Sequence, residues 1–379
     1  MIKILVAGDY VPLNDALASI ESSRFDILFG DIKGVISAAD YSLVNLECPL
    51  TTNKANPIRK SGPNLRCTNP KMLDALIWAG FNCVTLANNH FRDYGEDGVD
   101  TTLQACEKMN LDYVGGGHNL HEASTILYKN INSKTVAFIN ACEEEYSIAT
   151  PNSGGSNPLR PIQLFYDIQK ARNKADYVLL ILHGGIERYS LPTPRMQETF
   201  RFLIDTGADA VINHHQHCYS GYEIYKGHPI FYGLGNFSFC KPNVPKSWNE
   251  GFMVCLTLCE DKEPSFELIP YLQGSSISQM QGEVSQHFHK NVAMLNNIIS
   301  SPEKLKSSYQ ELLNKNHKSS LMQLEPLKNS FIRKLQWHHL FPHINSTKHY
   351  LTLLDLISCE SHRENMIHTL RHEIQISDD

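Results

Sequence analysis

The stretch Ala208-Asp209-Ala210-Val211-Ile212-Asn213-His214-His215-Gln216-His217 joins a short, mostly apolar run to a cluster of histidines. Such a run is typical of a buried strand. Four other apolar runs also end near side chains that can bind metal ions: Ile2–Ala7 before Asp9, Tyr41–Val44 before Glu47, Phe81–Ala87 before Asn89 and His90, and Tyr177–Leu182 before His183. In an open α/β sheet, ligands collect beyond the carboxyl ends of the strands. We therefore expect these side chains to converge on one site along one rim, and their chemistry predicts two divalent metal ions.

Length and composition limit the classes of protein to which the chain can belong. Its 379 residues suffice for one large catalytic domain and an appendage. A hydrophobic content of 42% and a charged content of 20% are ordinary for a soluble globular protein. The net charge of -6 argues against nucleic acid as a partner. No apolar stretch approaches the roughly 20 residues of a membrane helix.

Cellular location is predicted from the first residues and from the cysteines. The start of the chain, Met1–Asp9, has only a short apolar run and is interpreted as a first core strand rather than a signal peptide. The ten cysteines form no C-x-x-C pair, which excludes the common zinc-finger and thioredoxin-like patterns. Buried free thiols in a reducing compartment account for them. The sequence therefore predicts a cytoplasmic protein.

The order of elements predicts an α/β domain over residues 1–272 and a helical region over residues 273–379. Strand-like and helix-like segments alternate in the first part, whereas strand-like runs disappear from about Ser275. One helix is well delimited, because Asn69-Pro70 supplies a cap and a first-turn proline and Gly80 supplies a stop. The role of the helical region is left open.

Two long loops follow predicted strands. Thr51–Cys67 is rich in Asn, Pro, Lys and Arg, and Glu143–Pro161 is rich in Gly, Ser, Asn and Pro. Structureless loops of this length are uncommon in compact domains and need a reason. They are interpreted either as walls of a substrate cleft or as mobile surface loops.

The candidate ligands differ in what they offer. Asp9 and Glu47 are carboxylates at strand ends, where a buried negative charge needs a cation. Asn89 offers a neutral oxygen, and the neighbouring His90 can act as a ligand or a proton donor. The spacing His215-x-His217 predicts that both imidazoles lie on one face of an extended segment, each free to bind a different ion.

Six segments carry polar or glycine-rich motifs in a fixed order: Gly8-Asp9, Asn45-Leu46-Glu47-Cys48-Pro49-Leu50, Ala87-Asn88-Asn89-His90-Phe91-Arg92-Asp93-Tyr94-Gly95, His183-Gly184-Gly185-Ile186-Glu187, His214-His215-Gln216-His217 and Tyr232-Gly233-Leu234-Gly235-Asn236-Phe237. Together they resemble one family, the CapA (poly-γ-glutamate capsule synthesis) family. Their order and spacing match through about residue 270. The family belongs to the calcineurin-like metallophosphoesterase superfamily. The resemblance implies a four-layer α/β/β/α sandwich with a dinuclear metal site, followed here by a C-terminal helical appendage.

The resemblance also implies a role for each matching residue. Asp9 and His217 would bind the first ion, Glu47 would bridge the two ions, and the second ion would be bound by Asn89, His183 and His215. The expected catalytic residues are His90 as acid/base, Asn236 as a support of the site, and Glu187, which would orient His183 or touch substrate. Asn45, Asn88, Asp93 and His214 are expected to support the ligands, with His214 as an alternative ligand.

The chain departs from the family pattern at three places. Superfamily enzymes often have a histidine two residues after the first Asp, whereas Asp9-Tyr10-Val11 has none. The first ion would therefore be completed by water or substrate. Gly184 stands where relatives commonly have Trp, which removes an aromatic wall and leaves more room. Asn213 and Gln216 replace a common Gly and Pro around the histidine cluster.

The expected chemistry is hydrolysis at two ions of Mn, Fe or Zn, with His90 protonating the leaving group. The substrate would be a poly-γ-glutamate, a peptide, a phosphoester or another small molecule. Fold does not fix the reaction type, and two alternatives stay open. One is a peptide epimerase that moves a proton at an α-carbon. The other is a non-catalytic assembly factor for a capsule or envelope.

Overall fold

The computed structural model describes residues 1–379 apart from 53, 261 and 375–379. The chain forms two compact units, Met1–Leu305 and Lys306–Asp379. The first unit extends beyond residue 272, because Phe288 and Val292 of helix α9 (Gly282–Ile299) belong to its core. The end of the family-like domain at residue 272 stays a prediction.

The first sheet has eight strands in the order β16-β15-β14-β1-β2-β3-β4, and β13 pairs with β1 beside this path. The strands are β1 (Ile2–Tyr10), β2 (Tyr41–Leu46), β3 (Cys83–Thr85), β4 (Asp112–Val114), β13 (Asn236–Ser238), β14 (Glu250–Leu258), β15 (Ser265–Gln273) and β16 (Ile277–Gln279). Strands β1 to β4 are parallel, so their carboxyl ends lie at one edge. The expectation that strands end before Ser275 is wrong, because β16 pairs with β15.

The second sheet has six strands in the order β11-β12-β10-β9-β7-β6. They are β6 (Leu127–Ile131), β7 (Lys134–Cys142), β9 (Tyr177–His183), β10 (Ala210–His214), β11 (Tyr222–Tyr225) and β12 (His228–Phe231). The central strands β7, β9, β10 and β12 are parallel, and the two edge strands are antiparallel to them. A small separate sheet pairs β5 (Gly116–Gly117) with β8 (Gly155–Ser156).

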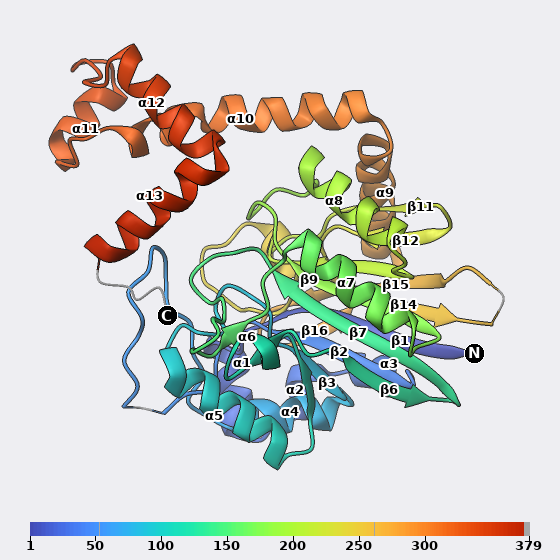
Figure 1. The fold of residues 1–379 in the computed structure, drawn as a ribbon. Coiled ribbons are helices and arrows are strands. Elements are labelled where there is room, and N and C mark those ends of the chain that lie inside the picture. Colours follow the sequence, from blue (N-terminus) through green and yellow to red (C-terminus); the bar gives the residue numbers. More distant parts are fainter. Residues whose placement is uncertain (53, 261, 375–379) are drawn as a thin grey trace. The chain divides into compact units, whose positions relative to one another are not determined.

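Helices cover the outer face of each sheet, which gives four layers (Figure 1). The first sheet is covered by α1 (Asn14–Glu21), α2 (Phe25–Phe29), α3 (Ile32–Ser37), α4 (Lys71–Ala79) and α5 (Gly95–Lys108), and the second by α7 (Pro161–Arg172) and α8 (Pro194–Asp205). A short helix α6 (Leu120–Ala123) and a 3₁₀ turn η1 (Lys246–Asn249) complete the unit.

These layers arise because side chains along each strand alternate in direction. Leu5 and Ala7 of β1 pack toward the helices, whereas Ile4 and Val6 pack into the core between the sheets. Because successive side chains of a strand point to opposite faces, one strand serves two cores. The four-layer α/β/β/α fold expected from the resemblance is confirmed.

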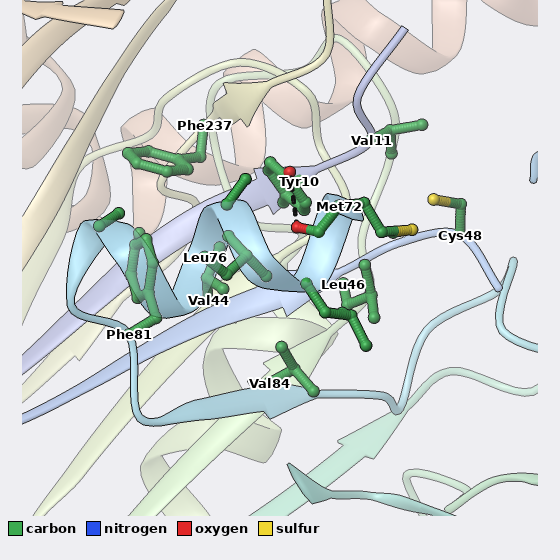
Figure 2. Packing of buried hydrophobic residues seen from close by; sticks show 14 of the residues in the cluster. Tyr10, Val11, Val44, Leu46, Cys48, Met72, Leu76, Phe81, Val84 and Phe237 are labelled. Carbon is green, nitrogen blue, oxygen red and sulfur yellow. Dashed lines mark hydrogen bonds between the residues drawn. The ribbon is translucent and has the colours of Figure 1, made fainter. Parts of the chain in front are cut away.

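Helix α4 shows how local sequence fixes an element. Figure 2 shows Leu76 of this helix packed near Val44 of β2, and the hydroxyl of Tyr10 donates to the carbonyl of Met72 over 3.1 Å. The helix ends at Gly80, which has a φ of 106°, a left-handed conformation that favours glycine. The predicted stop at Gly80 is confirmed.

The second unit consists of helices over its described residues: most of α10 (Pro302–Leu324), α11 (Ser330–Trp337), α12 (Thr347–Ser358) and α13 (Glu360–Glu373). The predicted helical character of this region is confirmed. Its buried Glu325 accepts hydrogen bonds from Gln336 and Tyr350, each 3.1 Å long. Among the helices of the described residues, none has the length and apolarity needed to cross a membrane.

Candidate metal centre

The candidate ligands lie at the carboxyl ends of strands from both sheets. Asp9 lies near the end of β1, and Glu47 directly follows β2. His183 is the last residue of β9, and His217 follows β10. The sequence predicts one rim, whereas the structure divides the ligands between two sheets that pack face to face.

Two groups of buried side chains share one carboxylate. Asp9, Glu47 and His217 form one group, and Glu47, His183 and His215 form the other. Within each group, one ligand atom from each residue lies within 4.8 Å of the others. The oxygen Oε1 of Glu47 lies 3.5 Å from Nε2 of His183 and 3.6 Å from Nε2 of His217. Five of the six expected ligands therefore lie in these two groups.

Three of the four carboxylate oxygens of Asp9 and Glu47 lack a hydrogen-bond partner among the described residues. Glu47 is 0% exposed, and neither of its carboxylate oxygens has a hydrogen-bond partner among the described residues. Burial raises the pKa of Glu47 well above its ordinary value, and the charge of Asp9 raises it further. Oxygen Oδ2 of Asp9 is also buried and unpartnered within the described chain. Buried carboxylate oxygens without donors fit a site for cations.

The amide of Asn45 holds the other oxygen of Asp9. Its Nδ2 donates to Oδ1 of Asp9 over 2.7 Å and lies 3.2 Å from Nδ1 of His183. Its Oδ1 accepts from Nδ2 of Asn88 over 3.3 Å. Burial alone would raise the pKa of Asp9, but contact with His217 and positive charge nearby outweigh it, so this pKa lies below its ordinary value.

Burial keeps two of the histidines in the neutral form that binds metals. It lowers the pKa of His183 well below its ordinary value, and the neighbouring imidazole of His215 lowers that pKa further. Burial also lowers the pKa of His215 to about 4. Nε2 of His183 lies 3.1 Å from Nδ1 of His215 and 3.1 Å from Oδ1 of Asn89. Asn89 therefore lies beside the second group.

The backbone around the histidine cluster is not extended. Strand β10 ends at His214, and the φ angles of His215 and His217 are 93° and 54°. The expected extended segment is therefore wrong. Left-handed conformations are unfavourable for non-glycine residues and tend to persist at functional sites. His215 belongs to one group and His217 to the other, and their binding of two different ions stays a prediction.

Asn236 contacts the first group. Its Oδ1 lies 2.9 Å from Nδ1 of His217, and its Nδ2 donates to the carbonyl of Trp248 over 3.0 Å. Asn236 begins β13, which pairs with β1 in a register that places it opposite Asp9. Asn236 thereby fixes the imidazole of His217.

His214 lies outside both groups. Its Nε2 lies 3.0 Å from the carbonyl of Ala7 in the first sheet, and its Nδ1 lies 3.2 Å from the carbonyl of Leu182 in the second. Both ring nitrogens therefore contact the backbone. His214 connects the two sheets beneath the centre.

His90 forms a chain of contacts with Asp93 and Lys60. Its Nδ1 lies 2.6 Å from Oδ2 of Asp93 and 3.1 Å from Nζ of Lys60, and Lys60 also forms an ion pair with Asp93. Burial lowers the pKa of His90, while the contact with Asp93 opposes that effect. Lys60 lies in the loop 51–67, whose contact with His90 favours the interpretation as a wall of the site.

The second loop also reaches the centre, through Glu145. Its carboxylate accepts from Nδ2 of Asn89 over 3.4 Å and lies 3.9 Å from Nε2 of His215. Sequence reasoning missed this residue, because no pattern distinguishes it within Glu143-Glu144-Glu145. Glu187 is exposed, and its negative charge raises the pKa of His215.

An aromatic wall borders the first group. The ring of His217 lies 4.8 Å from the ring of Trp248 and 5.3 Å from that of Phe239, measured between centroids. The wall therefore comes from residues 239–248 instead of position 184. The expected extra room at Gly184 is absent, because a Cβ there would lie 2.6 Å from Cγ of Glu143.

The sequence that builds this site matches a known protein family. Residues 3–241 match the model of the family described as bacterial capsule synthesis protein PGA_cap. The chain belongs to this family. The matched region contains every residue of the two groups and ends beside the aromatic wall.

Two relatives from Bacillus agree with this assignment. The chain is 33% identical over 221 residues to the capsule biosynthesis protein CapA of Bacillus anthracis, covering 56% of this chain and 54% of that protein. It is 34% identical over 223 residues to the PGA biosynthesis protein CapA of Bacillus subtilis, covering 58% of each. The chain thus spans little more than half the length of these relatives. A hypothetical protein from Thermus thermophilus aligns over 74% of this chain and 100% of its own, with 14% identity and a TM-score of 0.47.

Proposed function

We propose that the chain is a metal-dependent enzyme that acts on a γ-glutamyl polymer, a peptide or a phosphoester at a centre for two divalent cations. The observation that carries this proposal is the buried carboxylate of Glu47, whose two oxygens have no donor among the described residues and which belongs to both ligand groups. The names of the two Bacillus relatives concern capsule and PGA biosynthesis, which favours a glutamyl substrate.

The chain's own residues would hold the two cations. Asp9 and His217 would bind one ion, His183, His215 and Asn89 the other, and Glu47 would bridge them. Mixed carboxylate, amide and imidazole ligands favour Mn, Fe or Zn over Ca or Mg. Such ions supply Lewis-acid charge, which polarises a phosphoryl or acyl oxygen and makes water more acidic.

His90 would donate the proton that the leaving group needs. Asp93 contacts its Nδ1, which leaves Nε2 free to exchange a proton with substrate. Because Lys60 contacts both Asp93 and His90, the loop 51–67 would fix the orientation of the imidazole. Asn236 would hold His217 in place during turnover.

The proposal is tested by metal analysis and by turnover in heavy water. Protein purified without chelator is analysed for Mn, Fe and Zn, then incubated in D₂O with a γ-glutamyl oligopeptide and, separately, with an aryl phosphate. We expect about two ions per chain and a cleaved product. Deuterium at an α-carbon without cleavage would favour the epimerase.

The matched control variant is Glu223→Gln, since Glu223 is a largely buried glutamate of the same unit whose carboxylate pairs with Arg201 at 2.6 Å. It should retain the metal, whereas Glu47→Gln should lose at least one ion. Full metal content with neither cleavage nor exchange would leave the non-catalytic assembly factor as the better account.

A further inference from the structure

A lysine beside the proposed centre has no ion-pair partner among the described residues. Lys241 is partly buried, and its Nζ lies 4.0 Å from the ring centroid of Phe239 and 4.8 Å from that of Trp248. Across the part of the chain that the structure describes, Lys241 makes no ion pair with a carboxylate. The same two rings contact the imidazole of His217. One aromatic pair therefore contacts both a proposed metal ligand and a cation.

The charge of Lys241 acts on the centre. It lowers the pKa of Glu47, although burial and Asp9 raise that pKa by more. In return, burial lowers the pKa of Lys241, and the carboxylates of Glu47 and Glu187 oppose this effect. The ammonium of Lys241 is therefore partly desolvated, and no direct counter-ion among the described residues offsets this loss of hydration.

A second cation lies over the same indole. The guanidinium carbon of Arg188 lies 5.9 Å from the ring centroid of Trp248, and Arg188 also has no ion-pair partner among the described residues. Its φ of 61° is left-handed, and its backbone N–H donates to the carbonyl of Gln216 over 2.8 Å. A strained backbone bonded to the histidine loop fixes where this side chain begins.

Lys241 and Arg188 thus lie over the same buried indole, that of Trp248, which also contacts His217. Their two positive charges make this a candidate anion-binding site. Several other lysines of this unit have carboxylate partners, such as Lys246 with Glu250 at 3.0 Å. A guanidinium and an ammonium both suit carboxylate and phosphate oxygens. An anion would complete the pairing that the chain itself leaves open.

We propose that Lys241 and Arg188 bind an anionic group of the substrate, a carboxylate or a phosphate, beside the His217 end of the metal centre. This inference rests on the proposed function and deepens it, because it requires a substrate with a negative charge next to the reacting bond. It also predicts that neutral analogues of the substrate bind more weakly.

The test measures binding, so it does not depend on turnover. Isothermal titration calorimetry on the full chain, with and without Mn²⁺, compares three probes: tri-γ-glutamate, its fully amidated form and inorganic phosphate. For the wild type we expect binding of tri-γ-glutamate or of phosphate, and at least tenfold weaker binding of the amidated peptide. Preference for tri-γ-glutamate or for phosphate distinguishes the two anions.

The variants are Lys241→Met and Arg188→Met, each of which keeps most of the apolar stem. Each should raise the Kd of the preferred anion about tenfold or more, since a charge-assisted hydrogen bond is lost. Lys241→Arg should restore most of the affinity. The matched control is Lys33→Met, because Lys33 lies 4.7 Å over the ring of Trp78, away from the centre. It should bind as the wild type does.

Two results would overturn the inference: wild-type affinity in both Met variants, or no binding of either anion by the wild type. The proposed function fails separately. A chain that holds no metal and turns nothing over, yet loses anion binding on Lys241→Met, would contradict the enzyme and retain the anion site.

Discussion

Oxygen Oε1 of Glu47 lies 3.6 Å from Nε2 of His217, although Glu47 follows a strand of the first sheet and His217 follows a strand of the second. The proposed bridging carboxylate thus reaches across the boundary between the sheets. Each ligand group contains residues from both sheets, so neither sheet alone contains a complete group.

Replacing the shared carboxylate should have opposite consequences with and without metal. Glu47→Gln should release at least one ion and lower the stability of the metal-saturated protein by about 2–4 kcal/mol, the size of a lost ligand term. In metal-free protein it should be neutral or stabilising, because a buried carboxylate without donors is removed. Elemental analysis and thermal unfolding with and without chelator measure both. Full metal occupancy in the variant would show that Glu47 is not a bridge.

Removing His90 should affect turnover and spare the metal. We expect His90→Ala to lower kcat by about 10²–10⁴-fold, the usual contribution of a positioned acid/base. The matched control is His118→Ala, since His118 pairs with Asp100 at 2.9 Å on the exposed surface. It should keep wild-type turnover. A loss of less than about threefold in His90→Ala would remove this residue from the proton transfer.

The depressed pKa of His215 predicts loss of stability in acid. Its pKa in the folded chain, about 4, lies below its ordinary value of 6.5, so the unfolded chain binds more protons between these values. The stabilising effect is fully present above pH 6.5 and is lost as pH falls toward 4, on the order of 3 kcal/mol.

The measurement is urea unfolding of metal-free wild type and His215→Gln across this pH range. Glutamine does not titrate, so the variant should lose less stability than the wild type on acidification. Equal slopes in the two proteins would contradict the depressed pKa of His215.

The glycine before Asp9 should resist substitution. A Cβ at Gly8 would clash with the backbone carbonyl of Gly235, and backbone cannot give way as a flexible side chain can. Gly8→Ala should therefore cost about 2–3 kcal/mol and reduce metal content, because it displaces Asp9. Gly34→Ala is the control, since open space surrounds this helical position, and it should be neutral or stabilise by up to about 1 kcal/mol. Equal effects of the two substitutions would show that the close approach at Gly8 is unimportant.

Local pattern and chemistry predicted much of the centre. Apolar runs ending near Asp9, Glu47 and His183 are strands in the structure, and the ends at Asp9 and Glu47 converge because their parallel strands share an edge. The division between two sheets was not readable from the residues themselves, since both sheets use the same alternation of strands and helices. The layer order came from the family resemblance.

The residues that sequence reasoning missed lie in loops. Lys60, Glu145 and Lys241 carry ordinary surface charges, and no periodicity separates them from solvated neighbours. Their positions depend on tertiary contacts, such as the ion pair between Lys60 and Asp93. The left-handed backbone at His215 was likewise invisible, because its cost is offset by the structure around it.

The contact between His214 and the carbonyl of Ala7 joins residues 207 positions apart. Contacts over such a separation form slowly, because the entropy cost of closing a long loop must be met before the contact can stabilise the chain. During synthesis the acidic half of the centre leaves the ribosome long before its imidazoles exist. The candidate centre is therefore assembled late, because a nascent chain shorter than this span still lacks His215 and His217, one member of each ligand group.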